Sequence, residues 1–497
     1  DTPLPTTSPK KGQLVATIPA SFLATPGILT IAVEQDGIQS IDDFIVVAPD
    51  EGPFIFAISP SRIRIGEEKE ALELTGANFM NEAKVLVDGQ EVKTRNASRR
   101  RITAVITQDL LMTPGVHTIQ VQDKDGLLSN VGSFEVVPDV EVSTFAGSKF
   151  GFNREVECVN IEEALFRRPR RLALAPDGLL YVTDQQNHVI RTINPDTGEV
   201  CTIAGSGLSG YTDTGDSPDF EPSLSYPNGI VVASDGTLYV TENGNNVVRR
   251  ITRAGGEAML ETFAGINVMI TDKDRREELN STRVGRDGFR DGVATDAAFR
   301  LPDDIVVAPD GSLYLADPNN HAIRKITFNG GQAMVETIAG NGVPGFIDGA
   351  GEKARFDTPT GIALSLDGNF LYVADTRNNR IRRINLQTRR VETFAGSGDS
   401  GVVDGPAVTA TFAGPIGLAI DADGVIYVSE YLGNRIRRID PAGNVTTLAG
   451  NNKRRFRDGA GLQATFEQPR GLAIDRERGI LYVADYENFR VRAIALR

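Results

Sequence analysis

One acidic residue stands at the same point of each of six repeated segments. These residues are Asp184, Glu242, Asp317, Asp375, Glu430 and Asp485. A ring of carboxylates is chemistry that a metal ion or a hydrolase can use. However, each segment also carries an arginine in its next strand, and a catalytic site should break the symmetry of a repeat. We therefore predict that each acid makes a structural hydrogen bond or ion pair inside its own segment.

The residue that follows the first proline of each segment does break the symmetry. These residues are Arg170, Asn228, Asp303, Thr360, Ile416 and Arg470. Further basic residues lie near the two arginines, namely Arg167, Arg168, Arg171 and the loop Lys453-Arg454-Arg455-Phe456-Arg457. Arginine grips carboxylate, sulfate or phosphate through two N–H groups at once. The more ordinary interpretation of this basic sector is a solvated charge cluster paired with nearby aspartates, and the functional interpretation is an anion-recognition surface.

Few residues are suited to catalysis. The chain has 3 histidines, and Asn228 and Asp303 are the only metal-ligand types at the symmetry-breaking positions. His188 and His321 fall in hairpin turns, where we align them with Asn246, Arg380, Arg435 and Phe489 and expect a turn role. We find no Gly-x-Ser-x-Gly elbow, phosphate loop or paired-cysteine zinc signature. The sequence favours a protein that is not an enzyme.

Three loops between segments repeat an Asp-Gly pair, at Asp348-Gly349, Asp404-Gly405 and Asp458-Gly459. We expect turn chemistry here, with aspartate capping local N–H groups and glycine taking positive φ. A divalent cation such as calcium is the alternative, although the loops lack a dense series of oxygen ligands. Our prediction is that the protein uses no cofactor.

The chain has 2 cysteines, Cys158 and Cys201. Two thiols do not make a disulfide framework, so one bridge and two buried thiols both stay open. Cys158 lies in the loop before the first segment and Cys201 near that segment's last strand, so the two could meet.

The elements that position these residues are short strands. Six segments share a Pro-x-Gly-like start, an apolar strand, Asp-Gly, a Leu-Tyr-Val-x-acid strand, an Asn-rich turn and Ile/Val-Arg, and begin at Pro169, Pro227, Pro302, Pro359, Pro415 and Pro469. Five segments end in a fourth strand with Ala-Gly. Four short strands per repeat indicate the blades of a six-bladed β-propeller, with the symmetry-breaking residues at its channel mouth.

The sixth segment stops after its third strand at Arg497. The missing strand occurs at the other end of the repeats, because Val142–Gly147 matches Val391–Gly396 nearly residue for residue. We predict that this N-terminal strand completes the last blade and closes the ring, which leaves no free strand edge.

A second repeat precedes the propeller. The segment from Thr25 to Val33 matches that from Thr113 to Val121, and both alternate apolar and polar residues between turns, as hairpin strands of a β-sandwich do. The second copy has a front half, from Pro53 to about Ile106, but the first copy lacks one. We interpret the half copy as a cut from a longer protein, with completion by a neighbouring subunit as the alternative.

These motifs resemble two known families. Residues 51–138, with Ile58-Ser59-Pro60 and Leu72–Phe79, resemble an IPT/TIG immunoglobulin-like domain, and residues 1–50 resemble the back half of another. Residues 139–497 resemble NHL repeats, with Asn187-His188-Val189 nearest the name-giving tripeptide. The resemblance implies an all-β chain. Some propellers related to NHL repeats are lactonases or lyases that hold a metal near the channel mouth.

Composition limits the partners. The net charge of −14 argues against nucleic-acid binding, and no apolar run is long enough for a membrane-spanning helix. No secretory leader is visible at Asp1. We expect a bacterial protein, extracellular or at the cell surface.

Three functions remain open. The favoured one is a non-enzymatic binding or scaffold protein that presents the loop face of the propeller to a protein or acidic glycan. The second is a metal-dependent, lactonase-like hydrolase or lyase using Asn228 and Asp303. The third is a structural subunit that self-associates through residues 1–50.

Overall fold

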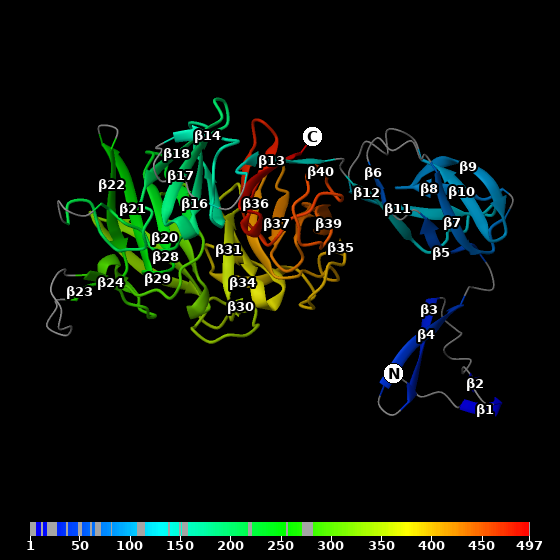
Figure 1. Ribbon diagram of the computed structural model, residues 1–497. Coiled ribbons are helices and arrows are strands. Elements are labelled where there is room, and N and C mark those ends of the chain that lie inside the picture. Colours follow the sequence, from blue (N-terminus) through cyan, green and yellow to red (C-terminus); the bar gives the residue numbers. More distant parts are fainter. Residues whose placement is uncertain are drawn as a thin grey trace. The chain divides into compact units, whose positions relative to one another are not determined.

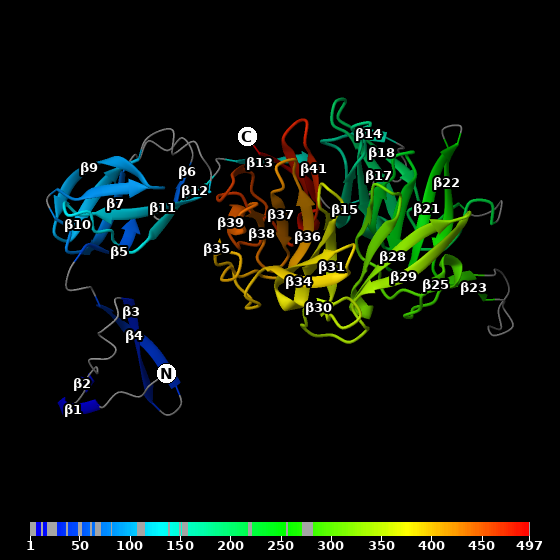
Figure 2. The ribbon, with the colours of Figure 1, turned by 180° about the vertical axis from the view of Figure 1, so that it is seen from behind.

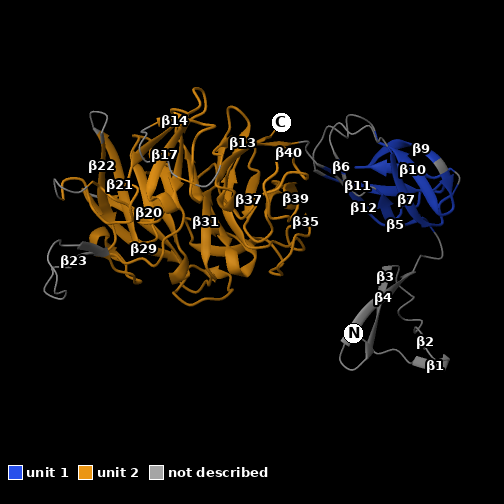
Figure 3. Cartoon of the chain, in the orientation of Figure 1, with its two compact units in different colours: residues 1–138 blue, residues 139–497 orange. Residues whose placement is uncertain are grey.

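The computed structural model contains two compact units, residues 1–138 and 139–497 (Figure 3). The structure describes residues 52–59, 62–64, 71–80, 82–106, 115–137, 140–148, 151, 158–216, 221–254, 257–270 and 282–496, with the backbone of four earlier strands. Among the described residues, no helix has the length and apolar character needed to cross a membrane.

The four earlier strands form two antiparallel pairs. β1 (Thr6–Lys10) pairs with β2 (Gln13–Ala16), and β3 (Gly27–Gln35) pairs with β4 (Ile38–Val47). The β3–β4 hairpin falls where the sequence predicts the back half of a sandwich. The side chains of residues 1–50 lie outside the described residues, and with them the predicted open edge and self-association.

The rest of the first unit is an immunoglobulin-like fold. Its strands are β5 (Phe54–Ser59), β6 (Arg62–Arg64), β7 (Ala71–Ala77), β8 (Lys84–Val87), β9 (Gln90–Ser98), β10 (Arg101–Val105), β11 (Gly115–Gln122) and β12 (Gly132–Val137). They hydrogen-bond in the order β5-β7-β10-β9-β8-β11-β12-β6. Alternate residues face the core, so Leu72 and Leu74 of β7 pack with Phe79, Ile102 and Phe134, all essentially inaccessible to solvent. This confirms the predicted sandwich.

The second unit is a six-bladed propeller (Figures 1 and 2). The first three blades, from inner to outer strand, contain β15 (Pro169–Leu174), β16 (Leu180–Asp184), β17 (Val189–Asn194) and β18 (Glu199–Ala204); β19 (Pro227–Val232), β20 (Leu238–Glu242), β21 (Val247–Ala254) and β22 (Glu257–Ala264); and β26 (Ile305–Val307), β27 (Leu313–Asp317), β28 (Ala322–Asn329) and β29 (Gln332–Ala339). A hairpin of β23 (Asn267–Ile270) and β24 (Thr282–Gly285) extends the loop between blades 2 and 3.

The last three blades follow the same plan. They contain β31 (Pro359–Leu364), β32 (Phe370–Asp375), β33 (Arg380–Asn385) and β34 (Arg390–Ala395); β36 (Pro415–Ile420), β37 (Ile426–Glu430), β38 (Arg435–Ile439) and β39 (Asn444–Ala449); and β41 (Pro469–Asp475), β42 (Ile480–Asp485), β43 (Arg490–Ala495) and β13 (Glu141–Ala146). A short strand from the preceding loop adds a fifth to every blade except blade 2, namely β14 (Cys158–Asn160), β25 (Gly292–Val293), β30 (Gly349–Ala350), β35 (Gly405–Pro406) and β40 (Gly459–Ala460), within the described residues.

Ring closure by the N-terminal strand is confirmed. β13 pairs antiparallel with β43, with Val142 opposite Ile494 and Thr144 opposite Arg492. In both views β13 lies beside the C-terminal strands (Figures 1 and 2). The two ends of this unit are therefore held in one sheet.

The inner strands crowd around the central axis. A Cβ atom on Gly361 would lie 2.3 Å from the carbonyl oxygen of Ile416, and one on Gly417 would lie 2.1 Å from that of Arg470. Only glycine tolerates such an approach of one inner strand to the next. The residue directly before each of these glycines therefore stands at a narrow channel mouth.

Candidate functional site

The six acid–arginine pairs are structural, as the repeat predicted. In blade 4, Arg382 Nη1 lies 2.7 Å from Asp375 Oδ2, and Arg382 Nη2 lies 2.5 Å from Asp348 Oδ1 in the preceding loop. The guanidinium lies over the rings of Phe346 (4.8 Å) and Phe356 (5.1 Å). We call this arrangement an arginine clamp, in which carboxylates take the N–H groups and aromatic rings pack on the cation.

The clamp recurs in the neighbouring blades. Its arginines, each with its strand acid and loop acid, are Arg249 (Glu242, Asp213), Arg324 (Asp317, Asp291), Arg437 (Glu430, Asp404) and Arg492 (Asp485, Asp458). Every one of these guanidiniums is fully buried, and each has at least one aromatic ring against it. A buried charge requires partners of this kind.

The clamps correct our interpretation of the aspartates in the Asp-Gly loops, whereas the positive φ expected of the glycines is confirmed at Gly349, Gly405 and Gly459. Asp348 accepts hydrogen bonds from Arg382 and, through Oδ2, from the backbone and hydroxyl of Thr393 at 3.2 and 3.0 Å. The loop aspartate therefore fastens two strands of a blade rather than capping its own turn. With its oxygens used in this way, it does not fit a calcium site.

Blade 1 departs from the pattern, although its arginine, Arg191, still has Nη1 3.7 Å from Oδ2 of the strand acid Asp184. Val159 of β14 pairs with Val200, as Gly349 pairs with Val391 in blade 4, so Cys158 takes the place of Asp348. Cys158 and Cys201 form a disulfide with a Cα–Cα distance of 4.1 Å. Of the two states left open, the structure shows the bridge.

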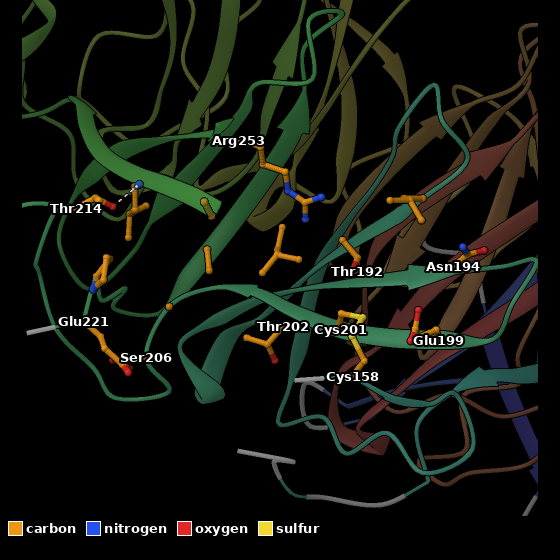
Figure 4. A pocket seen from close by; sticks show the side chains of 17 residues that line it. Cys158, Thr192, Asn194, Glu199, Cys201, Thr202, Ser206, Thr214, Glu221 and Arg253 are labelled. Carbon is orange, nitrogen blue, oxygen red and sulfur yellow. Dashed lines mark hydrogen bonds between the residues drawn. A yellow bond between two sulfur atoms is a disulfide. The ribbon is translucent and has the colours of Figure 1, made fainter. Parts of the chain in front are cut away.

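A cavity of about 800 Å³ adjoins this disulfide at the outer edges of blades 1 and 2 (Figure 4). Its charged lining residues are Glu199, Glu221 and Arg253. Although the volume would admit a small ligand, blades radiate from an axis and must separate at the rim. We attribute this crevice to that divergence and place the candidate site elsewhere.

The histidines take the predicted turn role, but our alignment of the turn was off by one residue in two blades. His188 and His321 have positive φ, as do Asn246, Asn379, Asn434 and Phe489, so Asn379 and Asn434 are the equivalents rather than Arg380 and Arg435. His188 Nδ1 accepts a hydrogen bond of 3.1 Å from Tyr226 N in the next blade. Burial lowers the pKa of both histidines, which suits a neutral imidazole acceptor.

A plug of three residues fills the centre of the channel mouth. Arg170 Nη2 and Arg171 Nη2 lie 2.5 and 2.7 Å from the two carboxylate oxygens of Asp303. Arg171 Nη1 also donates to the carbonyl of Ile416 at 3.0 Å, so the plug joins blades 1, 3 and 5 across the axis. Burial would raise the pKa of Asp303, but the charges of Arg170 and Arg171 outweigh it and hold that pKa well below its usual value.

The clamp carboxylates show the opposite balance. Burial raises the pKa of Asp184, Asp317 and Asp375 to about 6, although the clamp arginine of each blade works against the shift.

Three of the other predicted mouth residues, Asn228, Thr360 and Ile416, are buried beside the plug. Asn228 Oδ1 accepts from Gln185 Nε2 at 3.2 Å, and the hydroxyls of Thr360 and Thr376 lie 2.6 Å apart. Among the described mouth residues, no two carboxylates lie together and free to bind a metal ion, because both oxygens of Asp303 form ion pairs with arginines. The residues in place therefore do not fit the metal that the lactonase resemblance implies.

A second ring of mouth residues was missed by our sequence reasoning. These residues directly follow the six clamp acids and are Gln185, Asn243, Pro318, Thr376, Tyr431 and Tyr486. Arg470 lies over the rings of Tyr431 (5.0 Å) and Tyr486 (4.7 Å), and the Tyr486 hydroxyl donates to Gln185 Oε1 at 2.9 Å. Their variety from blade to blade was the signal that could have revealed them.

The accessible part of the mouth lies over blades 5, 6 and 1. Arg168, Gln468, Tyr431 and Arg470 are partly exposed around the buried Tyr486, and we call these five residues the mouth patch. Arg168 pairs with Glu487 at 2.9 Å.

The other members of the predicted basic sector lie outside the patch. Arg167, Arg454, Arg455 and Arg457 are exposed. Asn488 donates to the carbonyl of Arg455 at 3.3 Å, which fastens the basic loop to the turn that carries Tyr486. The structure thus brings Arg168, Arg170 and Arg470 around one tyrosine, with the basic loop on the outer side of that turn.

Three family models match the chain. An SMP-30/gluconolactonase/LRE-like region covers residues 172–450, an NHL repeat covers residues 466–494, and an IPT/TIG domain covers residues 53–136. The IPT/TIG match agrees with the immunoglobulin-like fold of the first unit.

Similar proteins are known. NHL repeat-containing protein 2 of Gallus gallus is 25% identical over 66% of this chain and 46% of that protein, and teneurin-1 of the same organism is 26% identical over 71% and 13%. The chain thus spans less than half the length of these relatives. An auxiliary nutrient binding protein from Bacteroides thetaiotaomicron has the same fold, with a TM-score of 0.52 and 20% identity over 90% of this chain and 98% of that chain. Since the first of the three family models covers more than half of the chain, the protein belongs to the SMP-30/gluconolactonase/LRE-like family of β-propellers.

Proposed function

We propose that this is a bacterial binding protein without catalytic activity, extracellular or at the cell surface, that meets a protein or acidic glycan at the channel-mouth face of the propeller. The observation that carries the proposal is the mouth itself. Its centre is occupied by the Arg170–Asp303–Arg171 plug, and its accessible side is cationic. This supports recognition at the surface rather than chemistry on a substrate held deep in the channel.

Two further observations support the location and the function. Disulfides persist mainly in oxidising compartments, and the Cys158–Cys201 bridge replaces an acid that the other blades use. The auxiliary nutrient binding protein shares the fold over nearly its whole length, which is a fold-level analogy for a binding role.

The basic loop gives a direct test. In Arg454→Glu/Arg455→Glu, both exposed charges reverse beside the mouth patch, and we expect at least about tenfold weaker binding to an immobilised uronate polysaccharide or acidic protein. Arg99→Glu/Arg100→Glu is the matched control, because it reverses two adjacent exposed arginines in the immunoglobulin-like unit. Equal binding by all three proteins, measured by biolayer interferometry, would refute the proposed surface.

A lactonase-like hydrolase is the second candidate, favoured by the family to which the chain belongs. It requires a divalent cation near Asn228 and Asp303, which are engaged with Gln185 and two arginines. We expect no lactone hydrolysis above background with added Ca²⁺, Zn²⁺ or Mn²⁺. Chelator-sensitive turnover by the purified protein would establish the hydrolase instead.

A further inference from the structure

Arg470 has half of the environment of a clamp arginine. Arg382 lies over two aromatic rings and meets two carboxylates, whereas Arg470 lies over two tyrosine rings and pairs with no carboxylate in the part of the chain that the structure describes. Within the described residues, its guanidinium makes one hydrogen bond, from Nη2 to Gln468 Oε1 at 3.2 Å. The buried Nε makes none, as is also true of Arg382 and the other clamp arginines, so the difference lies in the Nη groups. Aromatic contacts stabilise a cation without using its N–H groups, so those groups are left for another partner.

The nearby acids are already engaged. Asp303 holds Arg170 and Arg171, and Glu487 holds Arg168. Asp304, the remaining acid beside the plug, lies 3.6 Å from Arg171 Nε, and burial raises its pKa despite that arginine. Four arginines, Arg168, Arg170, Arg171 and Arg470, thus share three carboxylates. The raised pKa of one of these carboxylates, Asp304, disfavours its charged form.

The surroundings of Arg470 disfavour its charge. Burial, followed by the charge of Arg170, lowers the pKa of Arg470 to about 9. An arginine remains charged at neutral pH, so the direction of this shift means that folding places its charge in a less favourable setting than water. A charged group with a shifted pKa beside a channel mouth is a candidate for a functional site.

The clamps also indicate which anion fits. Each clamp guanidinium meets two carboxylates, one from the strand acid at Nη1 and one from the loop acid at Nη2, and a carboxylate is planar as the guanidinium is. We propose that Arg470, between Tyr431 and Tyr486, binds a carboxylate group of the ligand. This carboxylate takes the place that the protein's own aspartates and glutamates take in the clamps of the blades. This inference rests on the proposed function, because it names the group that the binding face recognises.

The test is calorimetric titration of the full chain with galacturonate, with a capped peptide containing one glutamate, with neutral galactose and with sulfate. We expect both carboxylates to bind more tightly than galactose and sulfate, and binding to weaken about tenfold or more in Arg470→Gln. If galacturonate binds more tightly than the glutamate peptide, the ligand is a sugar acid. If the peptide binds more tightly, the ligand is an acidic peptide. Arg470→Lys, which keeps the charge but loses the two-pronged geometry, should bind at an intermediate level.

Two controls keep the result interpretable. Arg389→Gln removes an exposed arginine whose Nη2 lies 2.8 Å from Glu336 Oε2. This variant should bind the ligands as the wild type does. Thermal unfolding verifies that each variant is folded. Equal affinity of the wild type and Arg470→Gln, or sulfate binding as tight as carboxylate binding, would overturn the assignment. If only this test fails while Arg454→Glu/Arg455→Glu still loses polysaccharide or protein binding, the proposed function stands without it.

Discussion

The blade interiors and the channel mouth both place arginines over aromatic rings, but they differ in how the charge is balanced. Arg382 is held by Asp375 and Asp348, and the same arrangement recurs with small changes around the ring. Arg470 has Tyr431 and Tyr486 but no carboxylate among the described residues. The acid–arginine pairs that recur around the ring stabilise the fold, whereas the arginine at the mouth, whose surroundings are not repeated in the other blades, is available to bind a ligand. The comparison predicts large stability losses inside the blades and little or none at Arg470.

The largest loss is expected at a clamp. Arg382→Met leaves Asp375 buried and without its cation, and we expect the free energy of unfolding to fall by about 3–5 kcal/mol. The adjacent Arg383 is the matched control, because its pair with Glu392 is partly exposed and Arg383→Met should cost about 1 kcal/mol or less. Denaturant unfolding of both variants gives the two values. Similar losses would show that the clamp has no special role.

The plug should be nearly as sensitive and should depend on pH. Asp303→Asn leaves Arg170 and Arg171 without a carboxylate, so we expect a loss of about 3 kcal/mol at pH 7. The folded pKa of Asp303 lies below its ordinary value of 3.8, so its contribution to stability is complete above about pH 4 and declines as the pH falls further. The gap in stability between wild type and variant should therefore narrow below pH 4. A gap that does not change down to pH 2 would contradict this assignment.

Blade 1 gives a smaller and more specific effect. Cys158→Ser/Cys201→Ser should lower the free energy of unfolding by about 2–4 kcal/mol, because it opens a loop of 43 residues. Cys158→Asp/Cys201→Ser should lose less, since an aspartate at this place can approach Arg191 as Asp348 approaches Arg382. If the two double variants are equally unstable, Cys158 does not correspond to the loop aspartate.

The sequence predicted the features that repeat. The six blades, the closing strand Val142–Gly147 and the structural role of the acid–arginine pairs followed from recurrence, because a residue set that appears in every blade must serve the blade. The positions of the symmetry-breaking residues at the mouth followed for the same reason.

Contacts across the axis could not be predicted. Arg171 reaches Asp303 and Ile416 in blades 3 and 5, and strand periodicity gives no distance between residues of different blades. Tyr431 and Tyr486 were overlooked because each follows a conspicuous clamp acid. Comparing that one position across all six segments would have exposed them. The role of Cys158 depended on strand register, which a single sequence does not show.

The free energy of unfolding of Arg470→Gln, without ligand, tests the central claim most directly. If Arg470 awaits a ligand carboxylate, the variant should be as stable as the wild type or slightly more stable, because a poorly balanced charge has been removed. A loss comparable to that of Arg382→Met would show that Arg470 belongs to the scaffold and would contradict the claim.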